Sequence, residues 1–239
     1  MFKKERDFYH LSDGNIEMRF THSETPYIFT IDEDAKLFDL LEIDERPILT
    51  VHQVHSDRVV AVKTAHKTEM LGQADGIVTS DPNALILIKN ADCLPIYMYS
   101  QDGTVFGGIH AGWRGSFSGI SDKALECFRS EFGVALEDIR VVLGIAAQKC
   151  CYEVSKEFFE QYSDAYPFML EGVFHFREGK LFYDNAQFLK NHFLSLGVKE
   201  ESIVVDSHCT ICSGEFHSFR KDATKRRNYA IIYRRNSEK

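Results

Sequence analysis

The stretch Val105–Ser118, VFGGIHAGWRGSFS, runs from an apolar segment through a histidine and a glycine-rich turn into a helical pattern. The apolar residues Val105–Ile109 are typical of a buried strand, and the spacing of apolar residues that follows predicts a helix over Ser116–Phe132. Glycines in the turn allow the backbone to approach a ligand closely, and a helix N-terminus favours anions. The stretch therefore predicts a strand, turn and helix that present His110 and Arg114, either in a binding site or in an ordinary loop.

Composition and charge exclude several broad classes of protein. Of the 239 residues, 44% are hydrophobic, so the chain can bury a sizeable core and is not intrinsically disordered. The net charge of −8 argues against nucleic-acid binding by bulk electrostatics, and no apolar run approaches the ~20 residues that span a bilayer. The first residues lack the apolar segment of a signal peptide. We therefore expect a cytoplasmic protein, with its six cysteines reduced, that binds neither nucleic acid nor membrane.

Short strands joined by short links predict a mixed sheet. Ile16–Thr21 and Tyr27–Ile31 are predicted to form a hairpin at its edge, and Ser155 is a candidate helix N-cap. The predicted architecture is one α+β domain over residues 1–239, with helices packed on a mixed sheet. The other predicted strands are Ile48–His55, Arg58–Lys63, Ala74–Ser80, Ala84–Lys89, Leu94–Tyr99, Ile139–Gly144, Ile203–Asp206 and Tyr229–Tyr233, and the other predicted helices are Asp32–Leu41, Ser155–Tyr162 and Asp184–Leu196.

Three residues at predicted strand ends form a candidate metal site: His55, Cys93 and His110. Neighbouring strands lie ~5 Å apart, so strand ends bring residues together that are distant in sequence. Two imidazoles and a thiolate suit zinc, and three protein ligands leave a fourth position open, as in catalytic zinc sites. An alternative interpretation is that these residues have only structural roles.

Copper is the competing metal for this trio. Two histidines and a cysteine also define a blue-copper centre. Multi-copper enzymes need further histidines, for which His-x-His pairs would be the sequence sign, and the chain has none. Zinc is therefore favoured over copper.

A second candidate metal site is the segment His208–Cys212, which contains a Cys-x2-Cys spacing. A second such pair is missing, so a structural zinc site would need a distant ligand, which Cys150 or Cys151 could supply. We favour the alternative that these cysteines are small buried hydrophobic residues.

The basic segment before the last predicted strand is a candidate for anion binding; its basic residues are Arg220, Lys221, Lys225, Arg226 and Arg227. Arginine contacts phosphate through two parallel hydrogen bonds, and Arg220 follows an aromatic, strand-like run that could point it into a site. A solvated charged turn is the usual alternative for such a run. On the strand Ile48–His55, alternate residues share a face, which pairs Gln53 with His55 and separates His52 from them.

Several segments resemble the YfiH family, whose members were called multicopper polyphenol oxidases and are now described as purine nucleoside phosphorylases with adenosine deaminase activity. The resemblance implies a single α/β/α sandwich-like domain and zinc ligands at His55, Cys93 and His110. It also implies that a purine nucleoside (adenosine, inosine, guanosine or methylthioadenosine) and phosphate are the substrates. The segments that carry the resemblance are QVHS (53–56), ADGIVTS (74–80), ADCLPI (91–96), GGIHAGWRG (107–115), CCYEV (150–154) and FHSFRKDATKRR (216–227).

Further site roles are hypotheses that accompany this resemblance. Cys93, His110 and Asp92 are assigned to catalysis, and Asp75 and Asp92 are candidates for proton transfer or for orienting ligands. The residues assigned to substrate or phosphate are Gln53, Asp75, Arg114, Arg220, Lys225 and Arg226.

Three other functions stay open. One is a peptidoglycan-precursor editing hydrolase acting on UDP-MurNAc-L-Ser, because an activated water also serves amide hydrolysis. Another is a non-catalytic, zinc-containing interaction protein, and the least favoured is a copper polyphenol oxidase. The chain is expected to be a monomer or a weak dimer.

Overall fold

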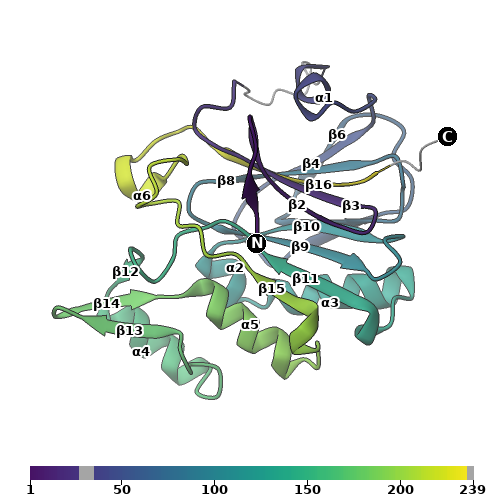
Figure 1. The fold of residues 1–239 in the computed structure, drawn as a ribbon. Helices are drawn as coiled ribbons and strands as arrows, with labels where there is room; N and C mark the ends of the chain where they lie inside the picture. Colours follow the sequence, from purple (N-terminus) through teal and green to yellow (C-terminus); the bar gives the residue numbers. More distant parts are fainter. Residues whose placement is uncertain (27–34, 236–239) are drawn as a thin grey trace.

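The computed structural model describes residues 1–26 and 35–235. Two β-sheets are stacked face to face, with helices on the outer side of each (Figure 1). This arrangement confirms the predicted class, in which helices pack on mixed sheets, and the central β layer contains two sheets rather than one. In the described ranges, no helix is long and apolar enough to cross a membrane.

The first sheet has seven strands in the order β1-β2-β3-β16-β8-β4-β6. It is mixed, because β4 runs parallel to both β6 and β8 while the other neighbours are antiparallel. The strands are β1 (Lys3–Lys4), β2 (Phe8–Asp13), β3 (Ile16–Thr21), β4 (Ile48–His52), β6 (Glu69–Gln73), β8 (Leu85–Asn90) and β16 (Asn228–Arg234).

The second sheet has six strands in the order β15-β11-β9-β10-β7-β5. It is also mixed, because the pairs β11/β15 and β5/β7 are parallel and the others antiparallel. The strands are β5 (Val59–Val62), β7 (Gly76–Thr79), β9 (Leu94–Ser100), β10 (Phe106–Ala111), β11 (Ile139–Leu143) and β15 (Ile203–Val205).

The core lies between the sheets, where β10 packs against β8 and β16. Gly108 of β10 makes this approach close, since a Cβ there would lie 2.9 Å from Ile86 and 3.3 Å from Ile88. Both β8 and β10 are covered on both faces and therefore read as continuous apolar runs rather than as alternating ones. The stretch Val105–Ser118 thus supplies a central strand of the molecule.

Helices cover the outer faces of the sheets. α3 packs on β5 and β7, and α1 places Leu37 and Phe38 against Leu85, Leu87 and Ile231 of the first sheet. The α-helices are α1 (Ala35–Leu41), α2 (Trp113–Phe117), α3 (Ile120–Phe132), α4 (Lys156–Ala165), α5 (Asn185–Ser195) and α6 (Phe219–Asp222), and short 3-10 helices span Leu136–Asp138 and Glu200–Ser202.

A small antiparallel sheet, β12-β14-β13, lies beside α4 at one side of the molecule (Figure 1). The sequence reading did not predict it. Its strands are β12 (Glu153–Val154), β13 (Phe174–Arg177) and β14 (Lys180–Tyr183).

Several local predictions need correction. The helix expected over Ser116–Phe132 is two helices, α2 and α3, separated at Gly119, whose φ of 86° no helix tolerates. The strand that begins at Ile48 ends at His52 rather than at His55. Arg220 lies on the short helix α6 instead of after a strand, because Ser218 caps that helix by accepting from the Lys221 N–H.

The predicted edge hairpin is wrong in its pairing where it can be compared. β3 pairs with β2 and β16, while the other predicted strand, Tyr27–Ile31, lies outside the described residues, as does the start of the helix predicted at Asp32. The predicted N-cap Ser155 is confirmed, since its hydroxyl accepts from the Phe158 N–H at the start of α4.

Candidate metal centre and substrate pocket

The three residues of the predicted metal site come together where strands of both sheets end. His110 lies near the end of β10 and Cys93 directly before β9, and these strands pair so that His110 faces Pro95. His55 reaches the same point from the loop after β4. Their donor atoms all lie within 4.8 Å of one another, and Cys93 Sγ is 3.9 Å from His55 Nε2. The three residues could therefore hold one metal ion.

Asp75 forms hydrogen bonds with two members of this trio, His55 and His110. Its side chain is fully buried, and its Oδ1 accepts a hydrogen bond from His110 Nδ1 at 2.9 Å. It also accepts from the backbone N–H groups of Val54, His55 and Ser56 at 3.2, 3.0 and 2.7 Å. These bonds hold His55 at a φ of 60° and leave Nε2 of His110 for a metal. Asp75 thus lies where it orients ligands, not where it contacts a substrate.

The electrostatics of the trio favour a thiolate. Burial alone would raise the pKa of Cys93, but the charges and hydrogen bonds of His110 and His55 lower it to about 6. Burial would lower the pKa of His110, but the Cys93 thiolate and Asp75 raise it to about 9. The thiolate is the form of cysteine that binds metals.

Gly112 provides room for the trio. A Cβ at this position would lie 3.0 Å from both Cys93 Sγ and His55 Cδ2. Its φ of −68° is ordinary, so glycine is needed here for space and not for conformation. The glycine-rich turn predicted that the backbone lies close to a ligand. In the structure the backbone at Gly112 lies close to the side chains of Cys93 and His55.

A cavity of about 410 Å³ opens onto the trio. Its volume falls within the range of small-molecule sites. Two cations, Lys89 and Arg227, line the cavity, and so does Phe219, which is 60% exposed. The complete lining is Val51, His52, Gln53, His55, Met70, Lys89, Ala91, Cys93, His110, Phe219 and Arg227.

Most of the basic residues predicted to bind anions do not line this cavity. Arg114 is exposed, with its guanidinium 4.3 Å from the Trp113 ring centroid. Arg220 Nη1 donates to the carbonyl of Glu153 at 2.7 Å. Lys225 and Arg226 are exposed in the loop before β16. Their anion-binding role stays a prediction, and the cavity offers other cations in their place.

Two basic residues line the cavity, Lys89, which the sequence did not indicate, and Arg227, which belongs to the basic segment predicted to bind anions. Burial lowers the pKa of Lys89, and the nearby charge of Arg227 lowers it further. They meet because β8 and β16 pair with Tyr229 opposite Lys89. Lys89 ends an apolar run two residues before the Ala91-Asp92-Cys93 segment, and this position is the one local sign that could have indicated it.

Two other predicted site residues, Gln53 and Asp92, form hydrogen bonds with neighbouring segments. Gln53 lines it, and its side-chain amide exchanges two hydrogen bonds with the backbone of Lys89, at 2.7 and 2.9 Å. Asp92 has a φ of 88°, and its carboxylate accepts from Thr210 Oγ1 at 2.7 Å and from the Arg220 N–H at 2.6 Å. Both side chains hold neighbouring loops against the strand ends that carry the trio.

Comparison with known proteins agrees with the motifs of the sequence. A family model described as multi-copper polyphenol oxidoreductase laccase matches residues 30–235. A protein of Aquifex aeolicus named purine nucleoside phosphorylase is 36% identical over 175 residues, 73% of this chain and 77% of the relative. One of Borreliella burgdorferi with the same name is 33% identical over 190 residues, 79% of this chain and 80% of the relative.

Solved structures share the fold over nearly the whole chain. The hypothetical protein YfiH of Bacillus licheniformis superposes with a TM-score of 0.86 at 24% identity, covering 98% of this chain and 99% of the other. YlmD from Geobacillus stearothermophilus gives a TM-score of 0.85, with the same identity and coverage. The chain therefore belongs to the YfiH family, whose family model is described as a multi-copper polyphenol oxidoreductase laccase.

Proposed function

We propose that this chain is a zinc-dependent purine nucleoside phosphorylase that also deaminates adenosine. The observation that carries the proposal is the combination of a metal-binding trio and a pair of cations in one cavity of nucleoside size. The names of the relatives in Aquifex aeolicus and Borreliella burgdorferi support the same activity. We further propose a cytoplasmic location, supported by six cysteines that are all free thiols in the structure.

The trio fits zinc by the chemistry of its donors. One thiolate and two imidazoles are zinc ligands, and three protein ligands correspond to a catalytic site with an open position. Asp75 supplies the carboxylate that commonly orients a ligating histidine, and Gly112 keeps the space between the donors clear. A bound zinc ion would supply a Lewis acid that activates water or polarises a substrate oxygen. His55, Cys93 and His110 would hold it.

The cations Lys89 and Arg227, which line the same cavity as the trio, would bind phosphate. In phosphorolysis a phosphate oxygen forms a bond to C1′ of the ribose while the bond from C1′ to the purine nitrogen breaks. The purine leaves with that electron pair and takes up a proton, giving the free base and ribose 1-phosphate. Held phosphate lies next to a sugar that becomes cationic, which stabilises the transition state electrostatically.

Phe219 would bind the base. Its exposed ring lines the cavity, and aromatic rings stack on the faces of purines with favourable energy. In this proposal the glycosidic bond lies between Phe219 and the cation pair, within the cavity that the trio lines. Deamination of adenosine exchanges the amino group for the oxygen of water and releases ammonia.

The test is product analysis with zinc-loaded protein. Inosine should yield hypoxanthine and ribose 1-phosphate only when phosphate is present, and adenosine should yield inosine without phosphate. Arg227→Ala should raise KM for phosphate about 10–100-fold, the loss of a charged hydrogen bond, whereas the matched control Arg226→Ala, in the exposed loop, should not. Equal effects of the two substitutions, or base release that ignores phosphate, would overturn the proposal.

A further inference from the structure

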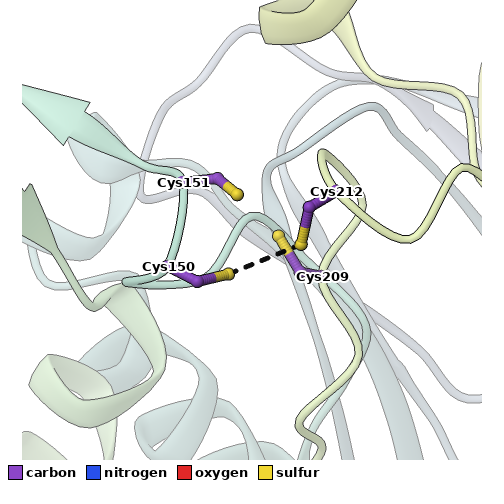
Figure 2. A group of neighbouring side chains, drawn as sticks. All are labelled: Cys150, Cys151, Cys209 and Cys212. Atoms are coloured by element: carbon purple, nitrogen blue, oxygen red, sulfur yellow. Dashed lines mark hydrogen bonds between the residues drawn. The ribbon is translucent and has the colours of Figure 1, made fainter.

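Four cysteines from two distant loops converge on the surface beside β11. Cys150 and Cys151 lie between β11 and β12, and Cys209 and Cys212 lie after β15 (Figure 2). All four sulfurs lie within 4.8 Å of one another. Because Cys150 and Cys212 are exposed and Cys151 is half-buried, the prediction that this group consists of small buried hydrophobic residues is wrong for three of its members.

We propose that these four cysteines bind a second, structural zinc ion. A tetrahedron with zinc–sulfur bonds of about 2.3 Å has sulfur–sulfur edges of about 3.8 Å. The sulfurs of Cys150 and Cys212 are 3.7 Å apart, which is far longer than the ~2.05 Å of a disulfide. Cys209 and Cys212 have the two-residue spacing of zinc-binding loops. The distances and the donor set both fit a closed tetrathiolate site.

The surroundings of the sulfurs suit a negatively charged zinc–thiolate centre. Arg177 donates to the carbonyl of Cys150 at 2.8 Å and brings a positive charge to the same loop. Four thiolates around a divalent ion carry a net negative charge that such a cation stabilises.

The proposed ion would join two loops that both hydrogen-bond to Asp92, the residue before Cys93 of the trio. Thr210, between the two loop cysteines, donates to Asp92 at 2.7 Å, and the N–H of Ala147 donates to the carbonyl of Asp92 at 3.0 Å. Asp92 directly precedes Cys93 in the chain. A zinc ion that cross-links Cys150 to Cys212, 62 positions later, would therefore fix the loops on both sides of Asp92.

The experiment counts zinc in purified protein by elemental analysis and native mass spectrometry. Zinc-loaded wild type should carry about two ions per chain, and Cys93→Ala and Cys212→Ala about one each, because each removes a ligand from a different site. The matched control Cys127→Ala, a thiol outside both groups, should carry as much zinc as wild type. If the trio binds no zinc, wild type and Cys93→Ala should both carry about one ion and Cys212→Ala none, so the two sites are judged separately.

A second measurement uses wild-type protein only and does not depend on how a variant folds. N-Ethylmaleimide labelling with peptide mapping should find the four cysteines protected until a chelator is added, while labelling of Cys127 stays the same.

Cobalt in place of zinc should give the visible bands of a tetrahedral thiolate site in Cys93→Ala. The proposal is overturned if Cys212→Ala keeps the zinc content of wild type, if iron occupies the site, or if a Cys150–Cys212 disulfide is found. Labelling of these thiols at equal rates with and without chelator would also overturn it.

Discussion

Replacing Asp75 by asparagine should weaken both the fold and metal binding. One oxygen of Asp75 accepts from Val54 and Ser56, and the other accepts from His55 and His110. An asparagine keeps one oxygen, so its NH2 group must face the N–H donors of the other side. In the less costly orientation the bonds to His55 and His110 are lost. The buried His55 N–H then lacks a partner, which costs about 1–3 kcal/mol of unfolding free energy, and the cost doubles if the proton of His110 stays on Nδ1.

Metal affinity should fall for a separate reason. If the new amide donates to Nδ1 of His110, the imidazole proton moves to Nε2, the nitrogen that a metal needs. Loss of a carboxylate that orients a histidine ligand costs about 10–100-fold in affinity. We therefore expect zinc to bind Asp75→Asn about 10–100-fold more weakly than wild type.

Urea unfolding of the zinc-free protein would measure the first effect, and competition with a chromophoric chelator would measure the second. Asp102→Asn is the matched control, because Asp102 accepts three hydrogen bonds in the exposed turn between β9 and β10, at the opposite end of these strands from the trio. The control should change neither zinc affinity nor, by more than about 1 kcal/mol, stability. A zinc affinity of Asp75→Asn equal to that of wild type would refute the role given to Asp75.

Three further changes probe the cavity. Gly112→Ala should lower zinc content while the thermal midpoint of the zinc-free protein stays near wild type, since the added methyl group would lie 3.0 Å from two donor side chains; unchanged zinc content by elemental analysis would contradict this. Asp92→Asn should lower the unfolding free energy measured in urea by about 1–3 kcal/mol, because it weakens the contacts of Asp92 with Thr210 and Arg220. Asparagine tolerates the positive φ at this position, so an unchanged unfolding free energy would show that these contacts are unimportant. Phe219→Ala should raise KM for inosine without raising KM for phosphate, whereas Phe168→Ala, 97% exposed and outside the cavity, should leave both constants unchanged.

The convergence of His55, Cys93 and His110 could be predicted because each of them carries a local sign. His55, Cys93 and His110 each follow or precede an apolar run at a polar or glycine-rich break, and strand ends of one sheet edge meet in space. The apolar run of β10 likewise predicted a buried central strand, because a strand covered on both faces leaves no polar alternation.

Arg227 belongs to the basic segment that was predicted to bind anions, but its meeting with Lys89 could not be predicted, because it depends on pairing between distant strands. Lys89 meets Arg227 only through the register of β8 with β16, and no local pattern fixes which strands pair. Proximity in sequence instead drew attention to Lys225 and Arg226, which lie in an exposed loop. The four-cysteine group was undervalued for the same reason, since its halves are joined by the parallel pairing of β11 with β15.

The hairpin β13–β14 was missed because its strands are short and partly exposed, with no clean apolar alternation. The break between α2 and α3 was missed because the apolar spacing continues through Gly119 although the backbone does not. Periodicity reports which face is buried, and it is insensitive to a single residue in a left-handed conformation.

The most direct test of the account is phosphate-dependent cleavage of inosine by zinc-loaded wild-type protein and by Cys93→Ala. We predict that wild type forms hypoxanthine and ribose 1-phosphate and that Cys93→Ala, which lacks the thiolate of the trio, forms neither while it still unfolds cooperatively. Phosphorolysis by Cys93→Ala at the wild-type rate would contradict the account.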